Sequence, residues 1–142
     1  MGLVLDASAA LAWLIDRANP AENLQAKEVL LTLETEDALV PVLWYAEVAN
    51  GILIAERRGV CAFDKSALFL STLNGLPVVD DAAQPWTVQR AALALARTYG
   101  LTGYDAIYLE LVLRTGRTLA TFDRQLAEAV RKAGGRVFGD VP

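Results

Sequence analysis

The sequence contains no histidine and only one cysteine, Cys61, among its 142 residues. The lack of histidine excludes Ser-His-Asp and Cys-His catalysis, and also zinc and non-haem iron sites that need an imidazole ligand. One cysteine forms neither an internal disulfide nor a cysteine-rich metal site, as expected for a protein of the reducing cytoplasm. The chemistry left to this chain is carboxylate chemistry.

The sequence also lacks long apolar runs and an excess of basic residues. The most apolar stretch, Leu3 to Ile15, contains Asp6 and Ser8 and has no basic segment before it, so we expect neither a membrane span nor a signal peptide. The net charge of −4 argues against broad, non-specific binding of nucleic acid. Hydrophobic residues nevertheless make up 54% of the chain and the mean hydropathy is +0.32, so we expect an apolar surface that a partner subunit covers.

Short β-type runs alternate with helical patterns along the whole chain. Strands are expected at 2–5, 38–41, 76–79, 118–120 and 136–138, and helices at 8–16, 21–36, 43–58, 63–74, 86–99, 103–115 and 123–133. Glycines lie where most of these helices should stop. Such alternation predicts parallel pairing through right-handed crossovers. We therefore expect one α/β domain over residues 1–142, a three-layer α/β/α sandwich with a mostly parallel sheet of four to five strands.

Two aspartates follow closely on predicted strands. Asp6 comes directly after the first strand, and Asp123 follows the strand at 118–120 after two residues. Ligands of open α/β sheets gather at the carboxyl ends of the strands, so we expect both acids at that edge. Each acid also stands where a helix begins, so N-capping is an alternative explanation for either one alone.

Two further acids stand in apolar helical segments. Asp105 shares a helical stripe with Tyr108 and Leu109, so its carboxylate is predicted to point toward the interior. Thr102 and Asp105 also have the spacing of a capping box, which explains the aspartate without any function. Glu47 lies in the middle of an apolar helical run, where capping explains little and a surface glutamate is the remaining alternative.

These four carboxylates have a common chemistry if the fold brings them together. Neighbouring carboxylates raise one another's pKa values and destabilise the fold unless a cation neutralises them. Oxygen ligands select hard ions such as Mg²⁺ or Mn²⁺, and magnesium keeps positions open for water and phosphate oxygens. Such an ion acidifies a bound water for attack on phosphorus and stabilises the negative charge that develops. Convergence of the four acids therefore predicts phosphodiester hydrolysis.

The residues around the acids also carry a family resemblance. Four segments are involved: VLDASA at 4–9, PVLWYAEVAN at 41–50, YDAIYL at 104–109 and LATFDRQL at 119–126. In this order they resemble the motifs of PIN-domain ribonucleases, and most of all those of the VapC toxins of bacterial type II toxin–antitoxin systems. The resemblance spans almost the whole chain and implies a single PIN domain over residues 1–142.

The resemblance implies a metal-dependent endoribonuclease toxin that cleaves a structured RNA such as tRNA or rRNA. Its catalytic acids, which would bind Mg²⁺ or Mn²⁺, are Asp6, Glu47, Asp105 and Asp123. Ser8 and Thr121 match hydroxyl positions of the family motifs, so we expect them to orient the carboxylates, with helix capping as the alternative.

Partners are also implied by the resemblance: a homodimer, and a cognate antitoxin of the VapB type whose C-terminal segment lies in an apolar groove. Trp13, Leu14 and the helix at 21–36 are candidates for this groove, with core packing as the alternative. An RNA track would use the basic residues Arg57, Arg58, Arg114, Arg117, Arg124, Arg131 and Lys132. Arg124 is the best candidate because it adjoins Asp123, and a plain surface charge is the alternative for each.

Three other acids, Asp16, Asp80 and Asp81, are expected to be surface residues rather than ligands, the last two in a loop. Two other functions remain open. A haloacid-dehalogenase-like phosphatase also has an aspartate after its first strand, but this chain has Ser8 where that family has a second acid. A non-catalytic interaction module with a PIN-like fold would not need a metal.

Overall fold

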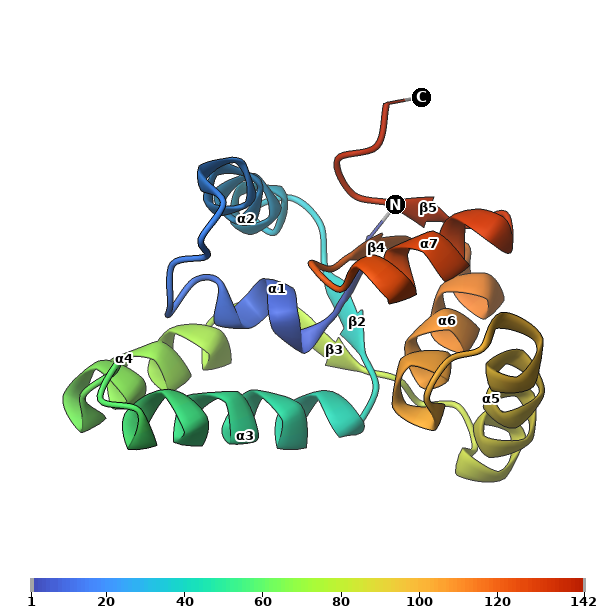
Figure 1. Cartoon of the computed structure of the whole chain (residues 1–142), viewed down its shortest axis with the longest axis horizontal. Helices are drawn as coiled ribbons and strands as arrows, with labels where there is room; N and C mark the ends of the chain where they lie inside the picture. The colour runs from blue at the N-terminus through green and yellow to red at the C-terminus, as the bar shows by residue number, and fades with distance from the viewer. Residues whose placement is uncertain (1, 142) are drawn as a thin grey trace.

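The computed structural model describes residues 2–141, which form a central sheet with helices on both faces (Figure 1). The strands are β1 (Leu3–Leu5), β2 (Ala38–Val40), β3 (Val78–Asp80), β4 (Thr118–Ala120) and β5 (Arg136–Val137). They lie in the order β3-β2-β1-β4-β5, and every neighbouring pair is parallel. The predicted three-layer α/β/α sandwich is confirmed, with a parallel sheet of five strands.

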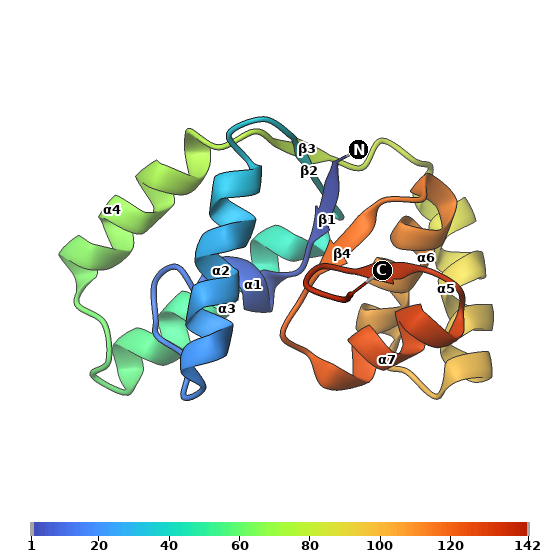
Figure 2. The same ribbon diagram turned by 90° about the horizontal axis from the view of Figure 1, so that it is seen from above.

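Seven helices connect the strands within the described range, as the sequence predicts. They are α1 (Ala7–Leu11), α2 (Pro20–Thr32), α3 (Leu43–Arg57), α4 (Phe63–Asn74), α5 (Pro85–Tyr99), α6 (Gly103–Thr115) and α7 (Arg124–Lys132). Figure 2, seen from above, shows α1 to α4 on one side of the sheet and α5 to α7 on the other. Within residues 2–141, no helix is long and apolar enough to cross a membrane.

Strand side chains alternate between two hydrophobic cores, one on each face of the sheet. Leu3 and Leu5 pack into the core shared with α1 to α4, whereas Val4 packs into the core shared with α6 and α7. Ala120 and Leu119 divide between the two cores in the same way. Because both faces are covered, the strands read as continuous apolar runs, which is the pattern from which parallel pairing is predicted.

The first helix is shorter than the sequence predicts. It ends at Leu11 rather than at residue 16, and the chain continues through turns in which the N–H groups of Trp13 and Leu14 donate to carbonyls three residues earlier. The Trp13 indole N–H donates to the Ala26 carbonyl of α2 at 2.8 Å. A contact with a distant segment therefore replaces the last helical turns, and helical periodicity does not report such a contact.

Gly51 allows α1 and α3 to approach closely. A Cβ built at this position would lie 2.3 Å from Cδ1 of Leu11, well inside van der Waals contact. Gly51 lies one turn after Glu47 on α3, and α1 starts directly after Asp6. The close packing of these two helices brings the backbone segments that carry the two acids toward each other.

Candidate active site at the carboxyl edge of the sheet

The candidate site lies where β1 and β4 end beside each other in the middle of the sheet. The chain builds β1, β2 and β3 toward one edge and then places β4 on the other side of β1, so the ends of β1 and β4 flank a topological switch point. Asp6 follows β1 directly, and its backbone N–H donates to the Ala120 carbonyl of β4 at 3.0 Å. Sheet topology alone therefore places Asp6 beside the turn that carries Thr121 and Asp123.

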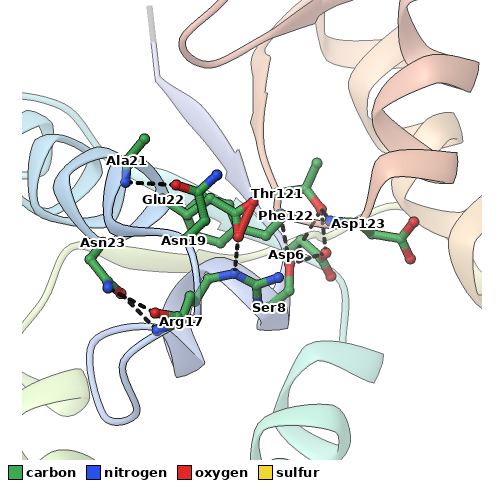
Figure 3. Close-up of polar contacts among 10 residues, drawn as sticks. All are labelled: Asp6, Ser8, Arg17, Asn19, Ala21, Glu22, Asn23, Thr121, Phe122 and Asp123. Carbon is green, nitrogen blue, oxygen red and sulfur yellow. Dashed lines mark hydrogen bonds and ion pairs between the residues drawn. The ribbon is translucent and has the colours of Figure 1, made fainter.

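Asp6 is buried, with 7% of its surface exposed, and is held by two hydroxyl groups (Figure 3). Its Oδ2 accepts hydrogen bonds from Ser8 at 2.7 Å and from Thr121 at 2.6 Å. The same hydroxyls accept the backbone N–H groups of Phe122 and Asp123, each at 3.0 Å. Asp6 stands at the N-cap position of α1, but its side chain makes no capping hydrogen bond, so the capping interpretation is wrong for this residue.

The environment of Asp6 disfavours its charged form. Burial raises its pKa above the ordinary value, the hydrogen bonds from Thr121 and Ser8 oppose this rise, and the charge of Asp123 adds to it. The two donors are neutral, so they orient the carboxylate without cancelling its charge. Asp6 therefore remains available to a cation.

Asp123 both caps a helix and belongs to the acidic cluster. Its Oδ1 accepts the Leu126 N–H at 3.0 Å, which confirms the N-cap interpretation for this residue. Its charge nevertheless raises the pKa values of both Asp6 and Asp105. Capping and a place in the cluster are therefore compatible for Asp123.

Asp105 is the acid on which all the others act. Thr102 is the N-cap of α6, and its Oγ1 accepts the Asp105 N–H at 3.2 Å, which is one half of the predicted capping box. The pKa of Asp105 is raised to about 6, first by burial and then by the charges of Asp123, Asp6 and Glu47. The fold therefore brings the four acids singled out from the sequence within electrostatic range of one another.

Glu47 reaches from α3 toward α6 and is half-buried, so the surface alternative for this residue is wrong. Its Oε1 accepts a hydrogen bond of 2.5 Å from the hydroxyl of Tyr108. Burial raises the pKa of Glu47, the Tyr108 hydrogen bond opposes this rise, and the charge of Asp6 adds to it. Sequence patterns missed Tyr108 as a site residue, because its spacing of three residues from Asp105 indicates a shared helix face but not the contact with Glu47.

The chemistry of the four acids suits a hard divalent cation. Burial and mutual repulsion raise the pKa values of Asp6, Glu47 and Asp105, and a cation relieves this conflict. Among residues 2–141, however, no three side chains of the metal-binding types are arranged closely enough to hold an ion. One oxygen of Glu47 bonds to Tyr108 and one oxygen of Asp123 caps α7. Coordination of one ion by several of these acids therefore requires a change in side-chain positions, in which Glu47 can keep its bond to Tyr108 and offer its second oxygen.

The basic residues expected along an RNA track fall into two groups. Four of them are bound in ion pairs. Arg114 pairs with Asp81 and Glu110, Arg117 with Asp37, Arg131 with Asp140, and Lys132 with Glu128. Arg57, Arg58 and Arg124 have no ion pair within the part of the chain that the structure describes. Arg124 is exposed at the start of α7 beside Asp123, so it remains the best candidate of this set.

The prediction of an exposed loop at residues 80 and 81 is wrong in part. Asp80 ends β3, and its carboxylate accepts the hydroxyl of Tyr45. Asp81 receives two hydrogen bonds from the Arg114 guanidinium, at 3.1 and 2.6 Å. Each aspartate is held by a side chain from a helix distant in sequence, which local composition does not reveal. Asp16 is exposed, as expected.

Arg17 is a second residue that sequence patterns missed. Its guanidinium carbon lies 4.7 Å from the centre of the Phe122 ring, and its Nε donates to Glu22 at 2.6 Å. Figure 3 shows the contact of the Arg17 guanidinium with Glu22. Phe122 lies between Thr121 and Asp123, so Arg17, paired with Glu22, packs on the turn that carries these two residues.

Large apolar side chains remain exposed on several helices. Of the predicted groove residues, Leu14 is buried in the core and Trp13 packs against it, whereas Leu24 and Leu31 of α2 are exposed. A separate apolar groove of about 830 Å³ lies between α5 and the starts of α3 and α6. Its lining includes the exposed side chains of Val42, Trp86, Leu93 and Tyr104. Exposed apolar patches of this kind mark interaction surfaces.

Comparisons with a family model and with a similar protein sequence point to the same family. The PIN domain model matches residues 3–132. The chain is 36% identical over 132 residues to Ribonuclease VapC3 of Pyrobaculum aerophilum, covering 90% of this chain and 94% of that protein. Its fold is similar to PAE2754 from Pyrobaculum aerophilum (TM-score 0.65, 24% identity, 91% of this chain and 79% of that one). It is also similar to FitAcB from Neisseria gonorrhoeae (TM-score 0.64, 17% identity, 96% of each chain).

Proposed function

The chain belongs to the PIN-domain family and, within it, to the VapC-type ribonucleases, and from this premise we propose that it cleaves a structured RNA such as tRNA or rRNA with Mg²⁺ or Mn²⁺ as cofactor. The toxin acts in the cytoplasm as a single PIN domain per chain and is neutralised by a cognate antitoxin of the VapB type. Family membership leaves the haloacid-dehalogenase-like alternative without support.

The observation that carries the proposal is the electrostatic coupling of four carboxylates from four different parts of the chain. The charges of Asp6, Glu47 and Asp123 all act on Asp105, whose pKa is raised to about 6. Uncompensated like charges in a half-buried site destabilise a fold, so a site of this kind is explained by a ligand that carries positive charge. Oxygen donors favour a hard divalent ion over softer metals.

Each residue then has a defined task. Asp6, Glu47, Asp105 and Asp123 would hold the cation, which supplies an acidified water and positive charge for phosphodiester hydrolysis when bound. Ser8 and Thr121 orient the Asp6 carboxylate through hydrogen bonds of 2.7 and 2.6 Å. Arg124, exposed beside Asp123, binds phosphates of the RNA backbone.

The partner surfaces follow from the exposed apolar residues. We assign the groove between α3, α5 and α6 to a second copy of the chain, because Trp86 and Val42 on its wall are 77% and 73% exposed. We assign the antitoxin segment to the face of α2 that exposes Leu24 and Leu31, two turns apart on the helix. A basic side chain of that segment would complement the acidic cluster.

The proposal is tested with purified protein and separate pools of tRNA and rRNA. Cleavage should require Mg²⁺ or Mn²⁺ and stop when EDTA is added. Asp6→Asn and Asp105→Asn should each abolish cleavage while the protein stays folded by circular dichroism. Cleavage that survives EDTA contradicts the metal-dependent mechanism. Folded protein that neither binds Mn²⁺ in calorimetry nor cleaves either RNA pool indicates a non-catalytic module instead.

A further inference from the structure

The hydroxyl of Tyr108 lies between two segments that carry proposed metal ligands. It donates to Oε1 of Glu47 on α3 at 2.5 Å. The charge of Asp6, which directly follows β1, also acts on this hydroxyl. We propose that Tyr108 is a positioning residue that fixes the Glu47 carboxylate in the orientation needed for metal binding, an inference that rests on the proposed function.

Tyr108 is suited to this task because its own position is fixed. Its side chain is 0% exposed and packs in the core beneath α6 and α7, together with Leu109 and Leu126. It follows Asp105 by three residues on α6, so the two side chains lie on the same face of the helix. One helix therefore presents one acid directly and anchors a second acid that comes from α3.

Glu47 needs such an anchor because its side chain is long and only half-buried. Within residues 2–141 the Tyr108 hydroxyl is its one hydrogen-bond partner. A free glutamate at the edge of a pocket samples several rotamers, and ordering it on metal binding costs conformational entropy. A buried donor removes part of that cost before the ion arrives, as partners of metal ligands commonly do.

The direction of this hydrogen bond follows from the chemistry of the two groups. An ionised carboxylate can only accept, so the phenol hydroxyl of Tyr108 donates to Glu47.

Tyr45 provides a matched control on the same helix as Glu47. Its hydroxyl also donates to a carboxylate, that of Asp80, but this pair is exposed and lies at the end of β3. Tyr45→Phe and Tyr108→Phe therefore remove the same atom from the same type of hydrogen bond. Only the second substitution touches the acidic cluster.

The experiment measures Mn²⁺ affinity by titration calorimetry on the metal-free full chain, together with thermal unfolding of each variant. We expect Tyr108→Phe to weaken Mn²⁺ binding about tenfold, the low end of the range for partners of metal ligands. Tyr45→Phe should leave the affinity unchanged. In a Glu47→Ala background, the further effect of Tyr108→Phe should fall below twofold, because the two residues act as one unit.

Two results would overturn the inference while leaving the proposed function intact. One is an unchanged Mn²⁺ affinity in folded Tyr108→Phe. The other is a loss of affinity on Tyr108→Phe that is equal in the wild-type and in the Glu47→Ala background. If Tyr108→Phe does not fold, 4-fluorophenylalanine at position 108 fills the volume of the hydroxyl without a donor, and the same tenfold loss is expected. A wild-type chain that does not bind Mn²⁺ overturns both this inference and the proposed function.

Discussion

Oγ1 of Thr121 lies 2.6 Å from Oδ2 of Asp6, although 115 positions separate the two residues in the chain. Parallel pairing of β1 and β4 creates this contact, since the two residues directly follow those strands. Thr121 is a neutral donor, so it offsets part of the cost of burying the carboxylate without neutralising it. A buried arginine in its place would also satisfy Asp6, but would remove the negative charge that a cation needs.

Thr121→Val should therefore destabilise the protein. The substitution keeps the shape of the side chain but removes a donor to buried Asp6 and an acceptor of the Asp123 N–H. We expect the free energy of unfolding in urea at pH 7.5 to fall by about 2 kcal/mol. Thr98→Val is the control, since that hydroxyl is exposed and bonds only to the Ala94 carbonyl of its own helix. Equal stability of the two variants contradicts a structural role for the Thr121 hydroxyl.

Asp105 should make the metal-free protein less stable as the pH rises. Its pKa is about 6 in the folded chain against an ordinary value of 3.8. Between these two values the folded state binds more protons than the unfolded state, so the free energy of unfolding falls with increasing pH. The contribution of Asp105 is fully present below pH 3.8 and is lost above pH 6. Asp105 is half-buried, so we expect a screened effect of about 1 kcal/mol.

Asp105→Asn checks this sign in urea titrations at pH 5 and pH 7.5 with EDTA present. The variant should lose less stability than the wild type between the two pH values, and a residual slope should remain from Asp6 and Glu47, whose pKa values are also raised. Asp140→Asn is the control, because the hydrogen bond from Arg131 lowers the pKa of Asp140 below its ordinary value of 3.8. This carboxyl is ionised in both the folded and the unfolded state at the two pH values, so its removal should leave the pH slope unchanged. A pH slope in Asp105→Asn as steep as that of the wild type refutes the prediction.

The sequence was sufficient to predict the framework of the site. Apolar runs and glycine stops identified every strand and helix of the described range, and the acids that follow β1 and β4 could be placed at one edge of the sheet. Two helix N-caps were also predictable from the sequence, since Thr102 caps α6 and Asp123 caps α7. These features are local, and local patterns are what a single sequence encodes most directly.

The side-chain contacts that complete the site were not predictable. Tyr108 meets Glu47 and Arg17 meets Phe122 only because separate helices and turns pack at particular angles, which no spacing within the chain specifies. The same holds for Arg114, which patterns place on a surface track but which binds Asp81. The predicted length of α1 was wrong for a related reason. The helix ends early where the Trp13 indole contacts the Ala26 carbonyl of α2, and this is a tertiary contact.

Arg124 and Arg131 should differ in their effects on RNA affinity. Arg124 is exposed and has no ion pair within the described chain, whereas Arg131 binds Asp140 at 2.7 and 2.8 Å. We expect Arg124→Ala to weaken tRNA binding several-fold and to reduce the slope of log affinity against log salt by about 1. Arg131→Ala should change neither quantity. Fluorescence anisotropy in EDTA measures both, and equal effects of the two substitutions refute a phosphate contact by Arg124.

Trp86 should control dimer formation. It is 77% exposed on the wall of the apolar groove, so its replacement by serine removes little packing within one chain. Buried tryptophans at interfaces commonly contribute about 2 kcal/mol or more, so Trp86→Ser should raise the dimer Kd on the order of 30-fold. Phe63→Ser is the control, because Phe63 is 78% exposed at the start of α4, outside the groove. Sedimentation equilibrium separates the cases: a monomeric wild type, or equal shifts in both variants, means that a second copy does not cover this groove.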